Sequence, residues 1–202
     1  MTSAPLRIVT LVEGDGEVQA LPVLLRRLVA EIAPDLCVDV PRPWRVSRNS
    51  LISKGGIESE IDQGYRSART PLPGCSYSST PMTTVPPNSA PRLLGRAQDA
   101  RPDLRSAVVL ANREFEAWFL ASASSLRNCA GMAADLEVPA DPEQPRGCKE
   151  WLSHRRTDNR PYSPTKHQTS LAAQFDLRLA RANATSFDKL WRDVEFLIRD
   201  TP

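Results

Sequence analysis

The sequence is poor in the residues that build metal clusters and disulfide frameworks. It has only two histidines, and its four cysteines stand far apart without a CxxC pair: Cys37, Cys75, Cys129 and Cys148. This spacing argues against a zinc site and against a secreted disulfide scaffold. Two histidines are also too few for a histidine-rich metal centre.

Long apolar runs and an excess of charge of one sign are lacking as well. No run approaches the roughly 20 residues that a transmembrane helix needs, and the first residues lead into a strand pattern rather than a signal peptide. We therefore expect a cytoplasmic protein without a membrane partner. The 26 Lys and Arg residues nearly balance the 24 Asp and Glu residues, which excludes a histone-like blanket of charge but allows a local basic groove.

What remains is the composition of a globular domain. The chain has 202 residues, of which 41% are hydrophobic and 25% charged. A chain of this length buries roughly 70% of the surface that its unfolded form exposes, so it needs no disulfides to form a core. We expect a single structural domain, with an α/β core over residues 1–135 and a helical region over residues 136–202 packed on it.

The N-terminal segment has the pattern of a strand followed by a helix. The β-branched run 6–12 ends before Gly14 and Gly16, which indicates a buried strand and a tight loop. Apolar residues then recur at intervals of three and four, as on a helix with one buried face: Val18, Leu21, Leu24, Leu25, Leu28, Val29 and Ile32. We expect Asp15 to cap this helix and Pro22 to be tolerated in its first turn.

Two carboxylates flank this strand-to-helix junction. Glu13 follows the strand and Glu17 begins the helix, at the edge where open α/β sheets place their ligand sites. Such a pair can hold Mg²⁺, a hard cation that prefers oxygen ligands. Alternatively, Glu17 only complements the helix dipole and Glu13 ends the strand in solvent. The spacing alone leaves both interpretations open.

Strand and helix patterns alternate along the chain until the last third, which is helical. We expect further strands at 36–40 and 106–111, and helices at 57–68, 93–100, 146–154, 171–182 and 187–198, the last one capped by Ser186. This alternation predicts an α/β open sheet flanked by helices, with a helical C-terminal extension.

A second strand-to-helix junction also carries carboxylates. Glu114 and Glu116 follow the expected 106–111 strand. The aromatic residues beside them, Phe115, Trp118 and Phe119, have helical spacing and indicate core rather than a base-stacking surface.

Cationic residues offer two candidate phosphate contacts. Lys149 is the one lysine of the 146–154 helix and can reach a phosphate, although a solvated lysine is the simpler interpretation. The cluster Arg42, Arg45, Arg48 and Lys54 is either a phosphate-facing patch or a solvated connection, and we favour the solvated connection.

Several motifs, in the same order along the chain, resemble a known family. The opening motif EGDGEVQALP begins at Glu13. It is followed by NREFEAWF from Asn112, the block 146–152, YSPT from Tyr162 and SFDKLW from Ser186. Together they resemble the bacterial domain-of-unknown-function 4276 family over nearly the whole chain.

That resemblance implies a Toprim-like fold, similar to the catalytic domains of topoisomerases, primases and overcoming-lysogenization-defect nucleases. It also implies a metal-dependent phosphoryl-transfer site, in which a glutamate after the first strand and an Asp-x-Asp after a later strand hold one or two Mg²⁺ ions. Glu13 matches the glutamate, and Glu17 and Glu116 are candidate additional metal ligands. Glu13 alternatively acts as a general acid or base, and Lys149 neutralises the phosphate.

The Asp-x-Asp is missing, and its expected place is the most unusual part of the sequence. Residues 70–91 contain six prolines and none of the roughly five or six charged residues that the composition predicts. By composition this stretch is a Pro/Ser/Thr linker. It lies, however, where the alternation of strands and helices requires a central strand.

A local frameshift explains both anomalies. When residues 74–91 are back-translated with GC-rich codons and read two bases later, they give Val-Leu-Leu-Leu-Leu-Asp-Ala-Asp-Asp-Asp, and the printed frame resumes at Arg92. We therefore hypothesise two compensating frameshifts across residues 74–90. The printed residues, with Pro81, Pro86 and Pro87, are then expected to form an irregular loop. An ordered central strand there would count against the hypothesis.

The expected function follows from this resemblance. We expect a Toprim-like, Mg²⁺-dependent phosphoryl-transfer protein of the nuclease type, acting on nucleic acid and serving as a phage-defence effector. This copy is expected to be impaired by the loss of the Asp-x-Asp. The printed chain should bind metal weakly, because the remaining carboxylates repel one another without the ligand geometry that offsets the repulsion.

The alternative is a non-catalytic subunit of an ATPase partner. Relatives of this fold occur with ATPases of the ATP-binding-cassette type in phage-defence systems, and the chain itself has no Walker motif. In that case the apolar face of the 187–198 helix is a docking surface, although such a face is more often part of the core.

Overall fold

A parallel sheet forms the centre of the computed structural model, which describes residues 6–67, 77–82, 90–108, 114–144 and 147–199. Its described strands are β1 (Leu6–Val12), β2 (Val38–Asp39), β3 (Trp44–Arg45), β4 (Tyr77–Met82) and β5 (Arg105–Ser106). They follow the order β2-β1-β4-β5, and β3 pairs with the carboxyl end of β1.

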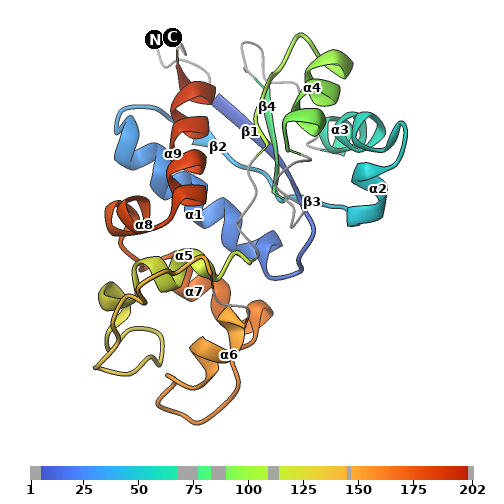
Figure 1. The fold of residues 1–202 in the computed structure, drawn as a ribbon. Coiled ribbons are helices and arrows are strands. Elements are labelled where there is room, and N and C mark those ends of the chain that lie inside the picture. Colours follow the sequence, from blue (N-terminus) through green and yellow to red (C-terminus); the bar gives the residue numbers. More distant parts are fainter. Residues whose placement is uncertain (1–5, 68–76, 83–89, 109–113, 145–146, 200–202) are drawn as a thin grey trace.

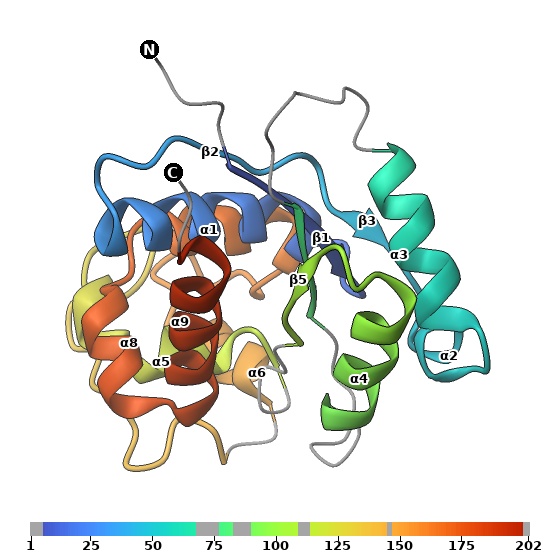
Figure 2. The same ribbon diagram turned by 90° about the horizontal axis from the view of Figure 1, so that it is seen from above.

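Helices cover both faces of this sheet. The described α-helices of the chain are α1 (Glu17–Ile32), α2 (Arg48–Ile52), α3 (Gly56–Ser67), α4 (Ala90–Ala100), α5 (Ala117–Ala121), α6 (Cys148–Ser153), α7 (Thr169–Ala172), α8 (Leu177–Asn183) and α9 (Thr185–Ile198). Figures 1 and 2 show α1 and α9 on one side of the sheet and α3 and α4 on the other. The expected fold class, an open α/β sheet flanked by helices with a helical C-terminal region, is confirmed.

The strand β1 is buried along its whole length because both of its faces are covered. Leu6, Ile8 and Val12 join the main core beneath α1 and the C-terminal helices. Leu11, on the opposite face, packs with a smaller cluster under α3 and α4 that includes Ile61. Alternate residues of a strand point to opposite faces, so this division explains the continuous apolar run 6–12, a strand predicted correctly at both ends.

The C-terminal helices close the main core with a chain of aromatic contacts. Ring centroids lie 5.4 Å apart for Trp118 and Phe187, 5.4 Å for Phe119 and Phe175, and 5.6 Å for Phe175 and Phe187. Trp118 Nε1 also donates a hydrogen bond of 2.8 Å to Ser186 Oγ. The interpretation of the second junction's aromatic residues as core is confirmed.

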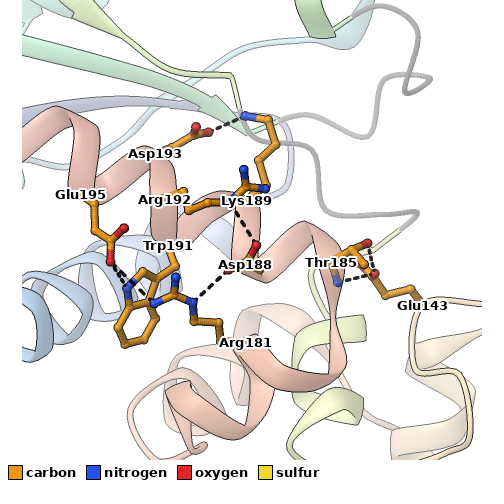
Figure 3. Close-up of polar contacts among 9 residues, drawn as sticks. All are labelled: Glu143, Arg181, Thr185, Asp188, Lys189, Trp191, Arg192, Asp193 and Glu195. Atoms are coloured by element: carbon orange, nitrogen blue, oxygen red, sulfur yellow. Dashed lines mark hydrogen bonds and ion pairs between the residues drawn. The ribbon is translucent and has the colours of Figure 1, made fainter.

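The apolar face of α9 belongs to this same core. Its members are at most 8% exposed: Phe187, Leu190, Trp191, Val194, Leu197 and Ile198. The sequence left open whether this face is a docking surface or core, and it is core. The outer face of the helix carries ion pairs instead, such as Arg181 with Asp188 at 2.9 Å (Figure 3).

Several expected helix ends and caps are wrong, and polar contacts explain two of these differences. The expected helix 171–182 is two helices, α7 and α8, because Asp176 Oδ1 accepts a hydrogen bond from Leu179 N at 2.8 Å and begins a new helix. Ser186 does not cap α9, since the N-cap residue is Ala184 and the Ser186 hydroxyl is used by Trp118.

Two of the expected strands are shorter in the structure. The strand expected at 36–40 is limited to β2. The strand expected at 106–111 appears only as β5, which pairs with β4 at Ser78 and Ser79. Residues 109–111 of that expected strand lie outside the described residues.

The segment expected to be an irregular loop contains a central strand. β4 pairs in parallel with β1 over six residues, from Arg7 with Tyr77 to Val12 with Met82, and with β5 on its other side. The expectation of a loop is therefore wrong for residues 77–82. A strand at this place completes the hydrogen bonding of β1 and β5, and Pro81 removes only its own N–H from the ladder. Residues 74–76 and 83–89 of the segment lie outside the described residues.

Glu143 supplies the cap that Ser186 does not. Its carboxylate accepts hydrogen bonds from Thr185 N at 2.8 Å and from Thr185 Oγ1 at 2.7 Å (Figure 3). It also accepts one from Ser186 N at 3.2 Å. A carboxylate at this position satisfies backbone amides at the start of α9 that have no partner within the helix.

We expect Glu143→Ala to lower the free energy of unfolding by about 2 kcal/mol, because three hydrogen bonds to a charged group at a helix start are lost. Urea denaturation measures this change. The control is Glu137→Ala, which removes an exposed glutamate of the same loop region and should change stability by no more than about 0.5 kcal/mol. Equal effects of the two substitutions would contradict the capping role.

In the part of the chain that the structure describes, no helix has the length and apolar character required to cross a bilayer.

Candidate active site at the carboxyl end of β1

The loop between β1 and α1 is held by close packing against a distant segment. Gly16, the N-cap residue of α1, has an ordinary helical φ of −65°. A Cβ at Gly16 would nevertheless overlap with Gln168 Oε1 and lie 2.6 Å from Pro164 Cβ. The π-helical turn at Pro164–Gln168 therefore packs directly on this loop, and the glycine is needed for that close approach.

An open pocket of about 910 Å³ lies against the same loop. Three separate parts of the chain line it: Glu13, Gly14, Asp15 and Glu17; Arg45, Val46, Ser47 and Asn49; and Lys149. Val46 N donates a hydrogen bond of 2.8 Å to Val12 O, which fixes the segment after β3 beside the end of β1. The pocket thus lies at the carboxyl edge of the sheet, where open α/β folds bind ligands.

Arg45 borders the pocket and corrects the role expected for Asp15. Arg45 Nε lies 3.0 Å from Asp15 Oδ1 and 3.3 Å from Glu13 O. Asp15 is therefore paired with Arg45, and α1 has no side-chain cap. Both side chains of this pair are about 60% exposed, so the ion pair adds little stability.

Lys149 brings the second strand-to-helix junction to the pocket. Its Nζ lies 3.9 Å from Glu114 Oε2 and 4.0 Å from Glu116 Oε2. These distances are too long for hydrogen bonds, but they keep the charges close. Glu116 is only 2% exposed, whereas 43% of the Lys149 side chain is accessible to solvent.

Glu17 is the most strongly perturbed acid of the pocket. Its pKa is raised from an ordinary value of 4.5 to about 7, mainly by burial and to a smaller extent by the charges of Glu116 and Glu13. A hydrogen bond from Gly14 N to Glu17 Oε2, at 3.4 Å, acts in the opposite direction. At neutral pH this carboxyl group is therefore distributed between its protonated and ionised forms.

The pKa values of Glu116 and of two neighbouring groups are also raised. Burial raises the pKa of Glu116, while the nearby Lys149 charge lowers it. Burial, followed by the charges of Glu114 and Glu116, raises the pKa of the Cys148 thiol to about 12. The pKa of Tyr162 is raised by burial and then by Glu116. Cys148 and Tyr162 are therefore neutral groups that line an acidic cluster.

The structure brings all four site residues suggested by the sequence to one place. Glu13, Glu17 and Lys149 line the same pocket, and Glu116 lies within 4.0 Å of Lys149. Two strand-to-helix junctions, about 100 residues apart in the sequence, thus meet at the start of α6.

The fit of this acidic cluster to Mg²⁺ is incomplete. Among the residues that the structure describes, no three Asp, Glu, His or Cys side chains are placed to hold a metal ion together. One of the candidate metal ligands, Glu116, lies beside the Lys149 ammonium instead. The carboxylates present do not fit a complete magnesium site.

A comparison with protein-family models identifies the family of this chain. Residues 89–195 match the domain of unknown function known as DUF4276. The chain belongs to this family. The DUF4276 match includes Glu116, Lys149 and the YSPT and SFDKLW motifs, whereas the motif that begins at Glu13 lies outside the matched range. Searches of curated proteins and of solved structures gave no match.

Sequence reasoning missed two groups that the structure places at this site. Arg45 was interpreted as part of a solvated connection, because nothing local shows that β3 pairs with the end of β1. The only sequence signal for Tyr162 is its place in the YSPT motif. Its side chain is buried beside Glu116.

Proposed function

We propose that this DUF4276 chain is a Toprim-like phosphoryl-transfer protein of the nuclease type that acts on nucleic acid in the cytoplasm. One observation carries the proposal: Glu13, Glu17, Glu116 and Lys149 converge at the carboxyl edge of a parallel sheet. Acids beside a cation at such an edge are the groups that phosphoryl transfer requires, namely proton carriers and a positive charge to stabilise the phosphate.

The cationic groups of the pocket provide the phosphate contact. Lys149 Nζ is not fixed by a hydrogen bond to either glutamate, and its half-exposed side chain can turn towards a ligand in the pocket. Arg45 lies across the same pocket as a second cation. Both cations can balance the charge of an anionic ligand. The pocket is open to solvent, so such a ligand can reach them.

The acids of the pocket provide proton transfer. A carboxyl group whose pKa is about 7 gives up or accepts a proton with little cost at neutral pH, so Glu17 is suited to general acid–base catalysis. Glu13 lies at the end of β1 and lines the pocket, where the family resemblance assigns either the metal or the acid–base role. The proposal includes both the metal-binding role and the acid–base role of Glu13.

The proposed magnesium site depends on the Asp-x-Asp that the printed sequence lacks. We propose that in an intact relative the residue equivalent to Glu13 and two aspartates would hold Mg²⁺, which would supply positive charge beside the phosphate. With Glu17 and Glu116 as the remaining candidate ligands, we propose that the printed chain binds the metal weakly.

The phosphate contact can be tested in the printed chain without any cleavage. We expect Lys149→Met to weaken the binding of a fluorescein-labelled single-stranded oligonucleotide roughly tenfold, because one charge-assisted contact to phosphate is lost. Fluorescence anisotropy at constant salt measures the affinity. Lys149→Arg should retain most of it, and Lys54→Met, at an exposed lysine outside the pocket lining, should leave it nearly unchanged. Equal losses for Lys149→Met and Lys54→Met would contradict the proposed site.

The alternative proposal, a non-catalytic subunit of an ATPase partner in phage defence, makes a different prediction. Co-purification with such an ATPase should then survive Glu13→Ala, and so should protection against phage. Loss of protection on this substitution, with the partner still bound, would favour catalysis.

A further inference from the structure

Glu116 lies between two side chains that can each satisfy its carboxylate. On the pocket side, Lys149 Nζ lies 4.0 Å from Glu116 Oε2. On the buried side, Tyr162 Oη and Glu116 Oε1 are both enclosed without a hydrogen-bond partner in the described part of the chain, and the tyrosine lowers the pKa of Glu116. Glu116 is 2% exposed and Tyr162 is 6% exposed, so water does not compete freely for either group.

Neither contact is complete. Glu116 Oε1 and Tyr162 Oη are both buried, and neither finds a hydrogen-bond partner of normal geometry among the described residues. The Lys149 contact is likewise longer than a hydrogen bond. Polar groups at catalytic sites often tighten their hydrogen bonds only when a ligand binds, and unsatisfied buried groups mark the places where this happens.

The two candidate partners differ in mobility. Tyr162 is fixed, since its backbone N donates a hydrogen bond of 2.8 Å to Ser153 Oγ and its ring packs against His167 at 5.7 Å. Ser153 Oγ in turn donates a hydrogen bond of 2.7 Å to Lys149 O, so the same serine joins both partners of Glu116. The Lys149 side chain, in contrast, extends into the pocket and is half exposed.

We propose that Tyr162 is a positioning residue: when Lys149 Nζ moves to an anionic ligand in the pocket, the Tyr162 hydroxyl donates its hydrogen bond to the Glu116 carboxylate. The exchange keeps a buried charge satisfied at the moment when its cationic neighbour leaves. Without it, ligand binding would leave an unpaired carboxylate in the core, which is strongly unfavourable. This gives the YSPT motif a role, and it relies on the proposed function only for the anion that attracts Lys149.

The exchange can be observed in the free protein, independently of any ligand. The chain has three tyrosines, so labelling with tyrosine carrying ¹³C at Cζ gives three NMR signals, and Tyr162→Phe identifies the one of interest. We expect Lys149→Met to move the Tyr162 signal downfield, because Glu116 then turns to the hydroxyl. Lys149→Arg, which keeps the charge, should leave the signal in place. In a Glu116→Gln background, Lys149→Met should have no effect on it.

The second measurement adds an anion. Sulfate is used as the probe, because its charge is constant at neutral pH. We expect sulfate to move the Tyr162 signal in the same direction as Lys149→Met does, and Tyr162→Phe to weaken sulfate binding roughly tenfold. In the Glu116→Gln background, Tyr162→Phe should cost nothing, since position 116 then carries no charge for the hydroxyl to satisfy. A purely structural role of Tyr162 would not depend on Glu116 in this way.

The outcomes separate this inference from the proposed function. If Lys149→Met weakens sulfate binding but the Tyr162 signal does not move under any condition, the exchange is wrong and the phosphate site stands. If sulfate binding does not depend on Lys149, the proposed phosphate contact is wrong and the ligand-driven step of the exchange fails with it. A Tyr162→Phe effect of equal size in the Glu116→Gln background also overturns the exchange.

Discussion

Replacing Trp118 with alanine should lower the free energy of unfolding by about 3–5 kcal/mol. The indole is fully buried, its ring lies 4.8 Å from that of Phe115 and 5.4 Å from that of Phe187, and its N–H donates to Ser186 Oγ. The substitution therefore leaves a large cavity between α5 and α9 and an unpaired hydroxyl beside it. Urea denaturation followed by circular dichroism measures the loss.

The matched control for Trp118→Ala is a large apolar residue on the surface. Ile52 at the end of α2 is 45% exposed, and Ile52→Ala should change stability by no more than about 0.5 kcal/mol. A loss of less than about 1 kcal/mol for Trp118→Ala would show that the aromatic chain joining α5 to α9 is not the centre of the core.

Replacing Glu17 with glutamine should stabilise the protein at pH 8 by about 3 kcal/mol, the equivalent of raising the carboxyl pKa from 4.5 to about 7 on folding. The folded state holds this proton more tightly than the unfolded state. Stability therefore falls as pH rises from about 4.5 to about 7, and the full penalty remains above that range. Glu116, whose pKa is also raised by burial, adds to the slope in the same direction.

Thermal or urea unfolding at several pH values between 4 and 8 measures this effect. We expect the decline in stability with pH to be much smaller in Glu17→Gln than in the parent chain. Glu31→Gln, an exposed position on the same helix that pairs with Arg178, should keep the parent slope. A parent chain whose stability is flat between pH 5 and 7 would contradict the burial of an ionisable Glu17.

The parts of the fold that were predictable are those where local pattern and tertiary contact agree. The apolar run 6–12 has the local pattern of a strand and is buried on both faces, and α1 follows from its helical periodicity. The helix expected at 171–182 failed because Asp176 interrupts a sequence whose apolar spacing continues through the break. The cap of α9 was not predictable, because Glu143 reaches it from a loop 42 residues away.

The candidate site shows a similar division. Its acids could be listed because each one follows a strand, and parallel strands end at a common edge. The partners of those acids depend on the folded C-terminal region. Lys149 reaches Glu116 from α6, and the π-helical turn at Pro164–Gln168 packs on Gly16 from a segment with no clear periodicity. Sequence pattern alone located the acids of the candidate site but not the side chains that surround them.

The register of β4 defines where an Asp-x-Asp would have to lie. In the alternative reading frame the Asp-Ala-Asp aligns with Thr80, Pro81 and Met82. Thr80 pairs with Thr10 and Met82 with Val12, at the end of β1 just before Glu13. The strand that the printed residues form here counts against the frameshift. The frame itself stays a prediction, and sequencing the gene from the codon for Thr70 to that for Arg92 decides it.

The most direct test of the proposed phosphoryl-transfer site is Mg²⁺-dependent nicking of supercoiled plasmid DNA. It compares the printed chain with a version that carries the alternative-frame peptide over residues 74–90. We expect nicking by the second protein, lost on Glu13→Gln, and little nicking by the first. Robust nicking by the printed chain would contradict the requirement for the missing aspartates. Nicking by the alternative-frame protein that survives Glu13→Gln would contradict an active site at the carboxyl end of β1.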